Sequence, residues 1–162
     1  MNKFKKILPW FLLVFLMLII YYLSNQPVGE SRDLTKKTLI IAADFIDRFI
    51  PIERFKTKGI VTKFRKSAHY FLYLAMALIV MFGLKSIGMK GKKRIITTLL
   101  VCVVFAISDE IHQLFVEGRG AEIGDVVIDT LGALSGIVIY QAFASFRKRR
   151  RAKQTDKREM IA

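Results

Sequence analysis

The sequence predicts an all-α membrane protein: a four-span transmembrane helical bundle with an additional interfacial amphipathic helix between spans one and two. The mean hydropathy is +0.37 and 53% of the 162 residues are hydrophobic, which is too apolar for an ordinary soluble domain. These apolar residues are gathered into long runs, as membrane-crossing helices require. The 27 Lys and Arg residues outnumber the 13 Asp and Glu residues and flank these runs, which favours contact with a membrane surface over nucleic acid.

The first span is expected at about residues 7–23, directly after three lysines. The apolar run is longer than that of a secretory signal, and no small-x-small cleavage pattern follows it, so we interpret it as an uncleaved span. Pro9 falls in the first turn of this span, where its missing N–H costs least. Trp10 and Tyr22 lie near the two ends, as interfacial anchors do.

The connection from Ser24 to Lys66 is expected to contain the interfacial helix, at Leu34–Ile50. Its apolar residues fall on one side and its charged residues on the other, a pattern typical of a helix that lies on a membrane. Pro51 then ends the helix. A short soluble helix packed on the spans explains the same pattern equally well.

Spans two and three are expected at about residues 67–84 and 95–114. The purely apolar part of span three ends at Ile107, which is too short to cross a bilayer core of about 30 Å. The helix must therefore continue through residues 108–114, and its polar side chains belong to the last turns of the span.

Span four is expected at about residues 123–146, after a tight turn that Gly118 and Gly120 mark. Residues 1–146 form the membrane domain in this prediction. Residues 147–162 form a basic cytoplasmic tail, expected to be disordered beyond its first few residues because of its charge.

The distribution of basic residues predicts the orientation of the protein. With four spans, both termini and the 85–94 loop share one side, and most of the Lys and Arg residues lie there. The positive-inside rule therefore predicts that the N- and C-termini are cytoplasmic. This orientation places three basic residues on the non-cytoplasmic side, just outside span two: Lys63, Arg65 and Lys66. A long loop tolerates such charges.

This topology brings polar residues from four separated stretches to the outer face of the membrane. Asp109, His112 and Gln113 share one helix face because they are three and four residues apart, as Asp125 and Asp129 do. Ionisable groups at the edge of a span are costly and indicate a partner or a function. No residue is assigned a catalytic role. The ligand-binding or polar-network candidates, which Ser24 joins, are Gln26, Lys66, His69, Asp109, Glu110, His112, Gln113, Arg119, Asp125 and Asp129.

Gly132 and Gly136 continue the face of Asp125 and Asp129 into the membrane. Their spacing is a small-xxx-small pattern, which lets another helix approach closely. We expect these glycines to serve helix packing, within the chain rather than between two copies.

The polar residues admit three interpretations. They can form a structural network in which His112 and Arg119 neutralise the carboxylates. They can recognise a headgroup, with Arg119 and Lys66 clamping a phosphate and the carboxylates bonding sugar or amide groups. Metal or acid–base catalysis is favoured least, because the sequence contains no HExxH motif and no Gly-rich phosphate loop, and Cys102 lies in mid-span. No metal and no cofactor are expected, and whether the protein is an enzyme stays open.

The sequence DEIHQLFVEGRGAEIGDVVIDTLGALSG, with its Asp, Glu, Gln, Arg and Gly positions, resembles the D-E-x-x-Q … R … D-[VL]-x-x-[ND]-x-x-G-x-x-x-G arrangement of the VanZ-like family. The resemblance extends over about residues 7–146. Ser24 with Gln26, and Lys66 with residues 69–73, resemble further patches of that family. Two positions depart from the pattern: Glu117 stands where proline is expected, and Asp129 stands where asparagine is frequent.

This resemblance implies a small bacterial protein of the cytoplasmic (inner) membrane, within the cell envelope. The namesake of the family is associated with low-level teicoplanin resistance, but no reaction is established for the family. We therefore expect an outward polar pocket that binds a lipid-linked envelope precursor or a glycopeptide-related ligand and affects teicoplanin susceptibility. The alternatives are a metal-dependent membrane hydrolase or transferase acting on a phospholipid-like substrate, and a non-catalytic accessory subunit. The lipid bilayer is the expected partner, nucleic acid is not, and the oligomeric state is left open.

Overall fold

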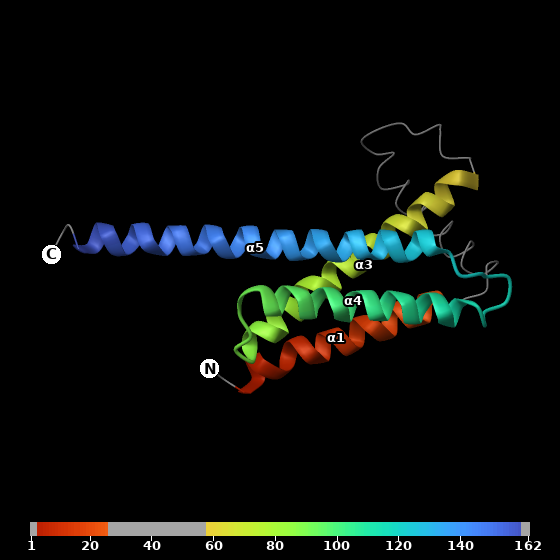
Figure 1. The fold of residues 1–162 in the computed structure, drawn as a ribbon, viewed down its shortest axis with the longest axis horizontal. Helices are drawn as coiled ribbons and strands as arrows, with labels where there is room; N and C mark the ends of the chain where they lie inside the picture. Colours follow the sequence, from red (N-terminus) through yellow and green to blue (C-terminus); the bar gives the residue numbers. More distant parts are fainter. Residues whose placement is uncertain (1–2, 26–57, 160–162) are drawn as a thin grey trace, which may run out of the picture.

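A computed structural model describes residues 3–25 and 58–159, and these parts of the chain are helical with short turns between the helices. Each of the four helices contains a segment long and apolar enough to cross a membrane. The predicted all-α chain with four such helices is therefore confirmed. The helices are α1 (Lys3–Ser24), α3 (Lys58–Ser86), α4 (Gly91–Gln113) and α5 (Ile123–Glu159) (Figure 1).

The predicted spans agree closely with the apolar parts of these helices. The predicted boundaries fall within a few residues of the observed ones at both ends of each segment. The membrane-crossing segments are Lys6–Ser24, Arg65–Ser86, Gly91–Gln113 and Ile123–Arg150.

Two expectations from the sequence fall in the connection between α1 and α3. The interfacial helix at Leu34–Ile50 and the candidate residue Gln26 both lie outside the described residues. Both stay predictions.

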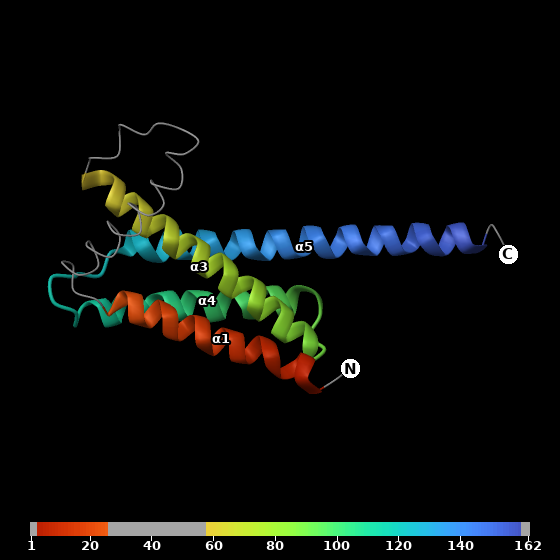
Figure 2. The same ribbon diagram turned by 180° about the vertical axis from the view of Figure 1, so that it is seen from behind.

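The helices form a bundle in which α5 packs mainly against α3 and also against α4, while α1 packs mainly against α3 (Figures 1 and 2). The end of α1, the start of α3, the end of α4 and the start of α5 lie together, and we call this the polar end of the bundle. The turn between α3 and α4 lies at the opposite end, together with both termini. The topology therefore collects polar residues that are far apart in the sequence.

The core runs along the contact between the helices, while their outer faces stay apolar. Large side chains such as Phe11, Phe15 and Val104 are exposed on those faces, as expected for helices that face lipid. The largest fully buried apolar side chains come from α1 and α3: Ile20, Tyr73, Met76, Val80 and Met81.

The turn between α3 and α4 begins with a helix C-cap that needs glycine. Gly88 has a φ of 89°, a left-handed conformation that an L side chain rarely adopts. The N–H of Gly88 donates to the carbonyl of Lys85 and the N–H of Met89 donates to that of Leu84, both at 3.0 Å. This is the Schellman pattern of hydrogen bonds. Met89 then packs on the core to which Leu84 belongs.

The turn between α4 and α5 also depends on one glycine. The N–H of Arg119 donates to the carbonyl of Val116 at 3.1 Å, and Gly118 between them has a φ of 73°. A positive φ at the third position matches a type II turn, in which proline is common at the second position. Glu117 occupies that second position, so the departure from the family pattern leaves the turn intact.

The crossing of α3 and α5 brings two backbones unusually close. A Cβ atom on Gly132 would overlap the carbonyl oxygen of Tyr70, and one on Gly136 would lie 2.5 Å from the carbonyl oxygen of Leu74. The two glycines are thus in contact with α3 of the same chain.

The expectation of a disordered basic tail is wrong, because α5 continues as a helix to Glu159. Its 37 residues extend about 55 Å at 1.5 Å per residue, well beyond a bilayer core. The stretch after Gly136 contains no further Gly or Pro and is rich in strong helix formers such as Lys, Arg, Ala and Gln. Arg147 and Arg150 also stack over Phe143 and Phe146, one helical turn earlier.

Candidate functional site

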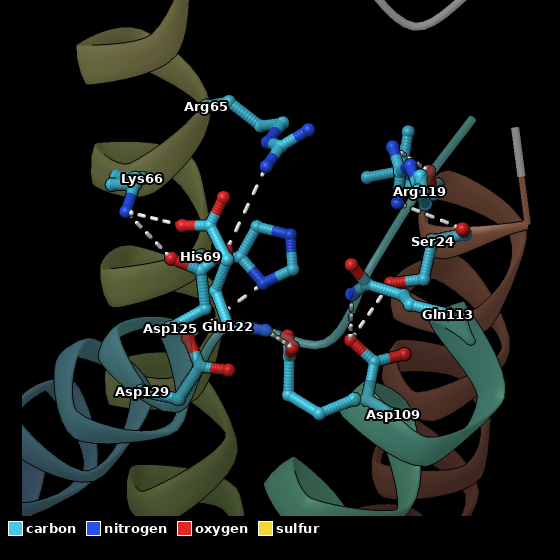
Figure 3. A network of polar contacts seen from close by, with 12 residues as sticks. Ser24, Arg65, Lys66, His69, Asp109, Gln113, Arg119, Glu122, Asp125 and Asp129 are labelled. Carbon is cyan, nitrogen blue, oxygen red and sulfur yellow. Dashed lines mark hydrogen bonds and ion pairs between the residues drawn. The ribbon is translucent and has the colours of Figure 1, made fainter. Parts of the chain in front are cut away.

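The polar end of the bundle contains a network of buried polar side chains to which all four helices contribute (Figure 3). Burying a polar or charged group away from water is costly unless another group compensates for the lost hydration. The buried members are Ser24, His69, Asp109, Glu110, Gln113, Asp125 and Asp129.

The outermost layer of this network consists of ion pairs between α3 and α5. Lys66 Nζ lies 2.9 Å from Asp125 Oδ1 and 3.0 Å from Glu122 Oε2. Arg65 Nη2 lies 3.6 Å from Asp125 Oδ2. The side chains of Arg65 and Lys66 are about one-third exposed, at 27% and 30%, whereas Asp125 is buried. These contacts join the start of α5 to α3.

The next layer inwards holds His69 and Asp129. His69 Nδ1 lies 3.6 Å from Asp129 Oδ1, which is an ion-pair distance but longer than a hydrogen bond. Asp129 is fully buried, and neither of its carboxylate oxygens has a hydrogen-bond partner among the described residues. A carboxylate in this position is poorly compensated for the loss of water.

Asp109 is better compensated than Asp129 for the loss of water on burial, because it accepts hydrogen bonds from two side chains. Ser24 Oγ donates a hydrogen bond to Asp109 Oδ2 at 2.8 Å, and Gln113 Nε2 donates to the same oxygen at 3.2 Å. Ser24 belongs to α1 and Gln113 lies one turn further along α4. Asp109 therefore connects the ends of α1 and α4 (Figure 3).

Glu110 connects α4 to the start of α5. Its Oε2 accepts a hydrogen bond from the backbone N–H of Glu122 at 2.8 Å, which satisfies a donor at the N-terminus of a helix and complements the helix dipole. Glu110 Oε1 is also buried but has no hydrogen-bond partner in the part of the chain that the structure describes. Among the described residues, only one of the two Glu110 carboxylate oxygens therefore accepts a hydrogen bond.

Arg119 ties the turn between α4 and α5 to the end of α1. Its guanidinium donates to the carbonyls of Ser24 at 2.8 Å and Leu23 at 3.4 Å. A cation at the C-terminus of a helix is favourable because the last carbonyls lack helical partners. Burial, followed by the nearby charge of Arg65, lowers the pKa of Arg119, while the neighbouring carboxylates oppose the shift. The guanidinium still keeps its proton at any physiological pH.

His112 lies on the side of α4 that faces α1. Its ring stacks on Tyr21 with the centroids 4.4 Å apart, and its Nε2 lies 3.3 Å from Asn25 Oδ1. Although His112 shares a helix face with Asp109 in the sequence pattern, these contacts hold it against the neighbouring helix. The structure thus places nine of the ten candidates, all but Gln26, at the polar end.

The sequence reasoning missed three participants. The sequence pattern identifies Arg65 only as a basic residue outside the span. It gives no role to Glu122, although Glu122 lies one turn before Asp125. The Tyr73 hydroxyl is the third: it is fully buried without a hydrogen-bond partner among the described residues. Tyr73 follows His69, the contact of Asp129, by one helical turn, and its ring lies 6.2 Å from that of Phe105 on α4. The spacing of Tyr73, four residues after His69, was the available signal.

The described residues include no group of three or more His, Cys, Asp or Glu side chains that would hold a metal ion. The network is therefore rich in carboxylates without forming a conventional metal centre. What it offers chemically is a set of buried acceptors behind a layer of ion pairs.

The model of the VanZ/LLP1 family matches residues 9–144, which include all of this network. The chain belongs to the VanZ/LLP1 family. The match confirms the resemblance noted in the sequence, and with the four apolar helices it indicates a multi-pass membrane protein. No significant match is found among curated proteins or among solved structures.

Proposed function

We propose that this VanZ/LLP1 protein binds the polar headgroup of a lipid-linked ligand at the polar end of the bundle. One observation carries the proposal: Glu110 Oε1, the Tyr73 hydroxyl and the Asp129 carboxylate are buried without hydrogen-bond partners among the described residues. Leaving such a group unsatisfied costs about 1–3 kcal/mol. Several such groups in one network favour a bound molecule that supplies the missing hydrogen bonds.

The arrangement of the network suits a ligand with two kinds of polar group. Lys66 and Arg65 are partly exposed and attract phosphate oxygens. The inner carboxylates accept hydrogen bonds from hydroxyl, amide or amine groups, because an ionised carboxylate has no donor. A phosphate-linked sugar or a glycopeptide carries such donors, and a lipid anchor would hold it at the depth of the network.

The distribution of charge supports an outward position for the polar end. Both termini, the basic turn between α3 and α4 and the basic end of α5 lie at the opposite end. The positive-inside rule assigns that opposite end to the cytoplasm. The polar end would then face the outer leaflet of the cytoplasmic membrane, where cell-envelope precursors are used and glycopeptides such as teicoplanin act.

The test is direct binding of a polyprenyl-diphosphate-linked sugar to protein reconstituted in lipid nanodiscs. We expect Asp129→Asn to weaken binding about tenfold, the effect of losing roughly 1.4 kcal/mol. Thr98→Val is the matched control, because Thr98 is also buried and polar but donates to the Arg94 carbonyl at the opposite end. Equal binding by wild type and Asp129→Asn, or no binding by wild type, would contradict the proposal.

A purely structural role for the polar residues is the second candidate. Its support is that Asp109 and Arg119 both make contacts that join different helices. If Asp109→Asn and Arg119→Ala protein disappears from the membrane, the structural role is sufficient. If both variants accumulate normally while ligand binding and any change in teicoplanin susceptibility are lost, the binding role is favoured.

A further inference from the structure

We propose that the inner part of the network is a binding site for a primary ammonium group, held by Asp129 and Glu110 beside the Tyr73 hydroxyl. This inference rests on the proposed function, since it names the chemistry of the group that reaches deepest into the site. It extends that function from a headgroup in general to an amine-bearing ligand.

The first support is the burial and unused bonding capacity of these three side chains. Asp129 and Tyr73 are 0% exposed and Glu110 is 4% exposed. Among the described residues, the buried atoms without a hydrogen-bond partner include both carboxylate oxygens of Asp129, one of Glu110 and the hydroxyl of Tyr73, and Asp129 Oδ1 keeps only the ion-pair contact with His69 at 3.6 Å. The buried Tyr73 hydroxyl is evidence for a site that does not depend on the cluster of acidic side chains. Tyr73 is not an acid, and its hydroxyl accepts as well as donates a hydrogen bond. It lies one turn after His69, whose ring contacts Asp129, and its own ring packs near Phe105 of α4, one turn before Asp109.

The second support is the balance of charge within the network. Among the described members, Asp109, Glu110, Glu122, Asp125 and Asp129 are acidic, whereas Arg65, Lys66 and Arg119 are permanently cationic. The carboxylates stay in excess even if His69 is protonated. The cations of α3 pair with the outer carboxylates Glu122 and Asp125. The remaining carboxyl groups, those of Asp109, Glu110 and Asp129, are all buried, and an uncompensated charge is most costly there.

The chemistry of these groups selects the ligand. Carboxylates only accept hydrogen bonds, so the ligand must donate them, and the excess negative charge favours a cation. A primary ammonium supplies three N–H donors and one positive charge. A quaternary ammonium carries the charge without donors, and a phosphate would add to the repulsion. The described residues include no group of three or more His, Cys, Asp or Glu side chains of the kind that forms an all-protein metal site.

A primary ammonium can come from a lipid headgroup or from a soluble amine, and two arms of one experiment separate these sources. In the first arm the full-length protein is placed in phosphatidylglycerol nanodiscs, and thermal unfolding is measured with ethanolamine or with tetramethylammonium at equal ionic strength. In the second arm the nanodiscs contain phosphatidylethanolamine or phosphatidylcholine, whose headgroups differ only by methylation of the nitrogen. Stabilisation by the primary ammonium and not by its methylated counterpart is expected in at least one arm.

Two variants and one matched control locate the effect. Tyr73→Phe removes only the buried hydroxyl, and Asp129→Asn replaces the carboxylate by a neutral amide of the same shape with one acceptor fewer. Each should reduce the apparent affinity for the primary ammonium at least fivefold. Tyr70→Phe is the control: Tyr70 lies one turn away on α3, but its hydroxyl donates to Ser135 at 2.7 Å, outside the network. Tyr70→Phe should bind as wild type does. If Asp129→Asn fails to fold, the affinity of Tyr73→Phe for the primary ammonium still tests the proposed site.

Equal stabilisation by methylated and unmethylated amines, no stabilisation in either arm, or full binding by Tyr73→Phe would overturn the ammonium site. The proposed function has a separate test, because the polyprenyl-diphosphate-linked sugar used there can be chosen without an amine. Retained binding of that amine-free lipid would show that only the ammonium inference has failed. Loss of both binding activities would remove the headgroup proposal as well.

Discussion

At the scale of single residues, the buried carboxylates of the polar end differ in how they are compensated for the loss of water. Asp109 accepts two hydrogen bonds and Asp125 forms ion pairs with Lys66 and Arg65. Glu110 uses one oxygen to cap α5, and among the described residues Asp129 contacts the ring of His69 at 3.6 Å. Among the described residues, compensation is thus least complete at Asp129 and at one oxygen of Glu110, which is why we place the ligand there.

The first prediction at this scale concerns Arg119. Arg119→Ala should lower the free energy of unfolding by about 1–3 kcal/mol, because the carbonyls of Leu23 and Ser24 lose a charged donor. Unfolding of the purified protein by SDS titration measures this. Arg119→Lys keeps the charge but not the forked geometry and should lose an intermediate amount. An unchanged midpoint for Arg119→Ala would contradict the anchoring role.

The second prediction concerns the pair of Lys66 and Asp125. A double-mutant cycle with Lys66→Met and Asp125→Asn should give a coupling free energy of about 0.5–3 kcal/mol, since the two charges are 2.9 Å apart and Asp125 is buried. Each single variant leaves one charge without its nearest partner, so the double variant should be more stable than the sum of the single effects implies. Additive effects would show that the ion pair contributes nothing to folding.

At the scale of the helices, small residues and caps determine how closely the helices approach. Gly132 and Gly136 let α5 cross against the backbone of α3. Gly83 has a similar role elsewhere in the bundle, since a Cβ there would lie 3.3 Å from Trp10 Cζ2. The close crossing of α3 and α5 also sets the distance between Lys66 and Asp125 and between His69 and Asp129. Packing by glycine is thus a condition for the network.

The third prediction tests that packing. Gly132→Ala should destabilise the protein by about 1–3 kcal/mol, because the added methyl group overlaps the Tyr70 carbonyl and forces α3 and α5 apart. Gly124→Ala is the matched control on the same helix, where a Cβ would meet nothing within 4 Å. There alanine should leave stability unchanged or raise it by up to about 1 kcal/mol. SDS unfolding of both variants gives the comparison, and equal midpoints would show that the crossing is looser than described.

At the scale of the whole molecule, the topology separates an acidic-rich polar end from a basic opposite end. The cationic end extends outward because α5 continues about 20 Å beyond residue 146, at 1.5 Å per residue. Charges of this kind interact with the anionic cytoplasmic leaflet and hold the orientation of a membrane protein.

The fourth prediction follows from this separation. Single cysteines at the exposed positions Glu117 and Arg150 should react differently with an impermeant thiol reagent in intact cells, with labelling at 117 and none at 150. Cys102 is fully buried and should stay unlabelled, which makes the parent chain its own control. Labelling at 150 but not at 117 would place the polar end in the cytoplasm and would remove the envelope ligand from consideration.

The sequence alone determined the features that depend on local periodicity and length. The four apolar helices, the shared face of Asp125, Asp129 and the packing glycines, and the resemblance to the VanZ-like family all follow from spacing along one chain. The four helices are long and apolar enough to cross a membrane, as a bilayer core of about 30 Å requires. The tail after residue 146 is the exception: its charge predicts disorder, whereas its strong helix formers continue α5 to Glu159.

Only the tertiary structure decided which polar groups meet. Lys66 pairs with Asp125 and Glu122, Arg119 binds carbonyls of α1, and Glu110 caps α5. His112 stacks on Tyr21 of α1, and the Tyr73 ring lies 6.2 Å from that of Phe105 of α4. These pairings depend on the rotation, depth and separation of helices that are far apart in the sequence. A helix period of 3.6 residues assigns a side chain to a face, but only packing determines which neighbour that face meets.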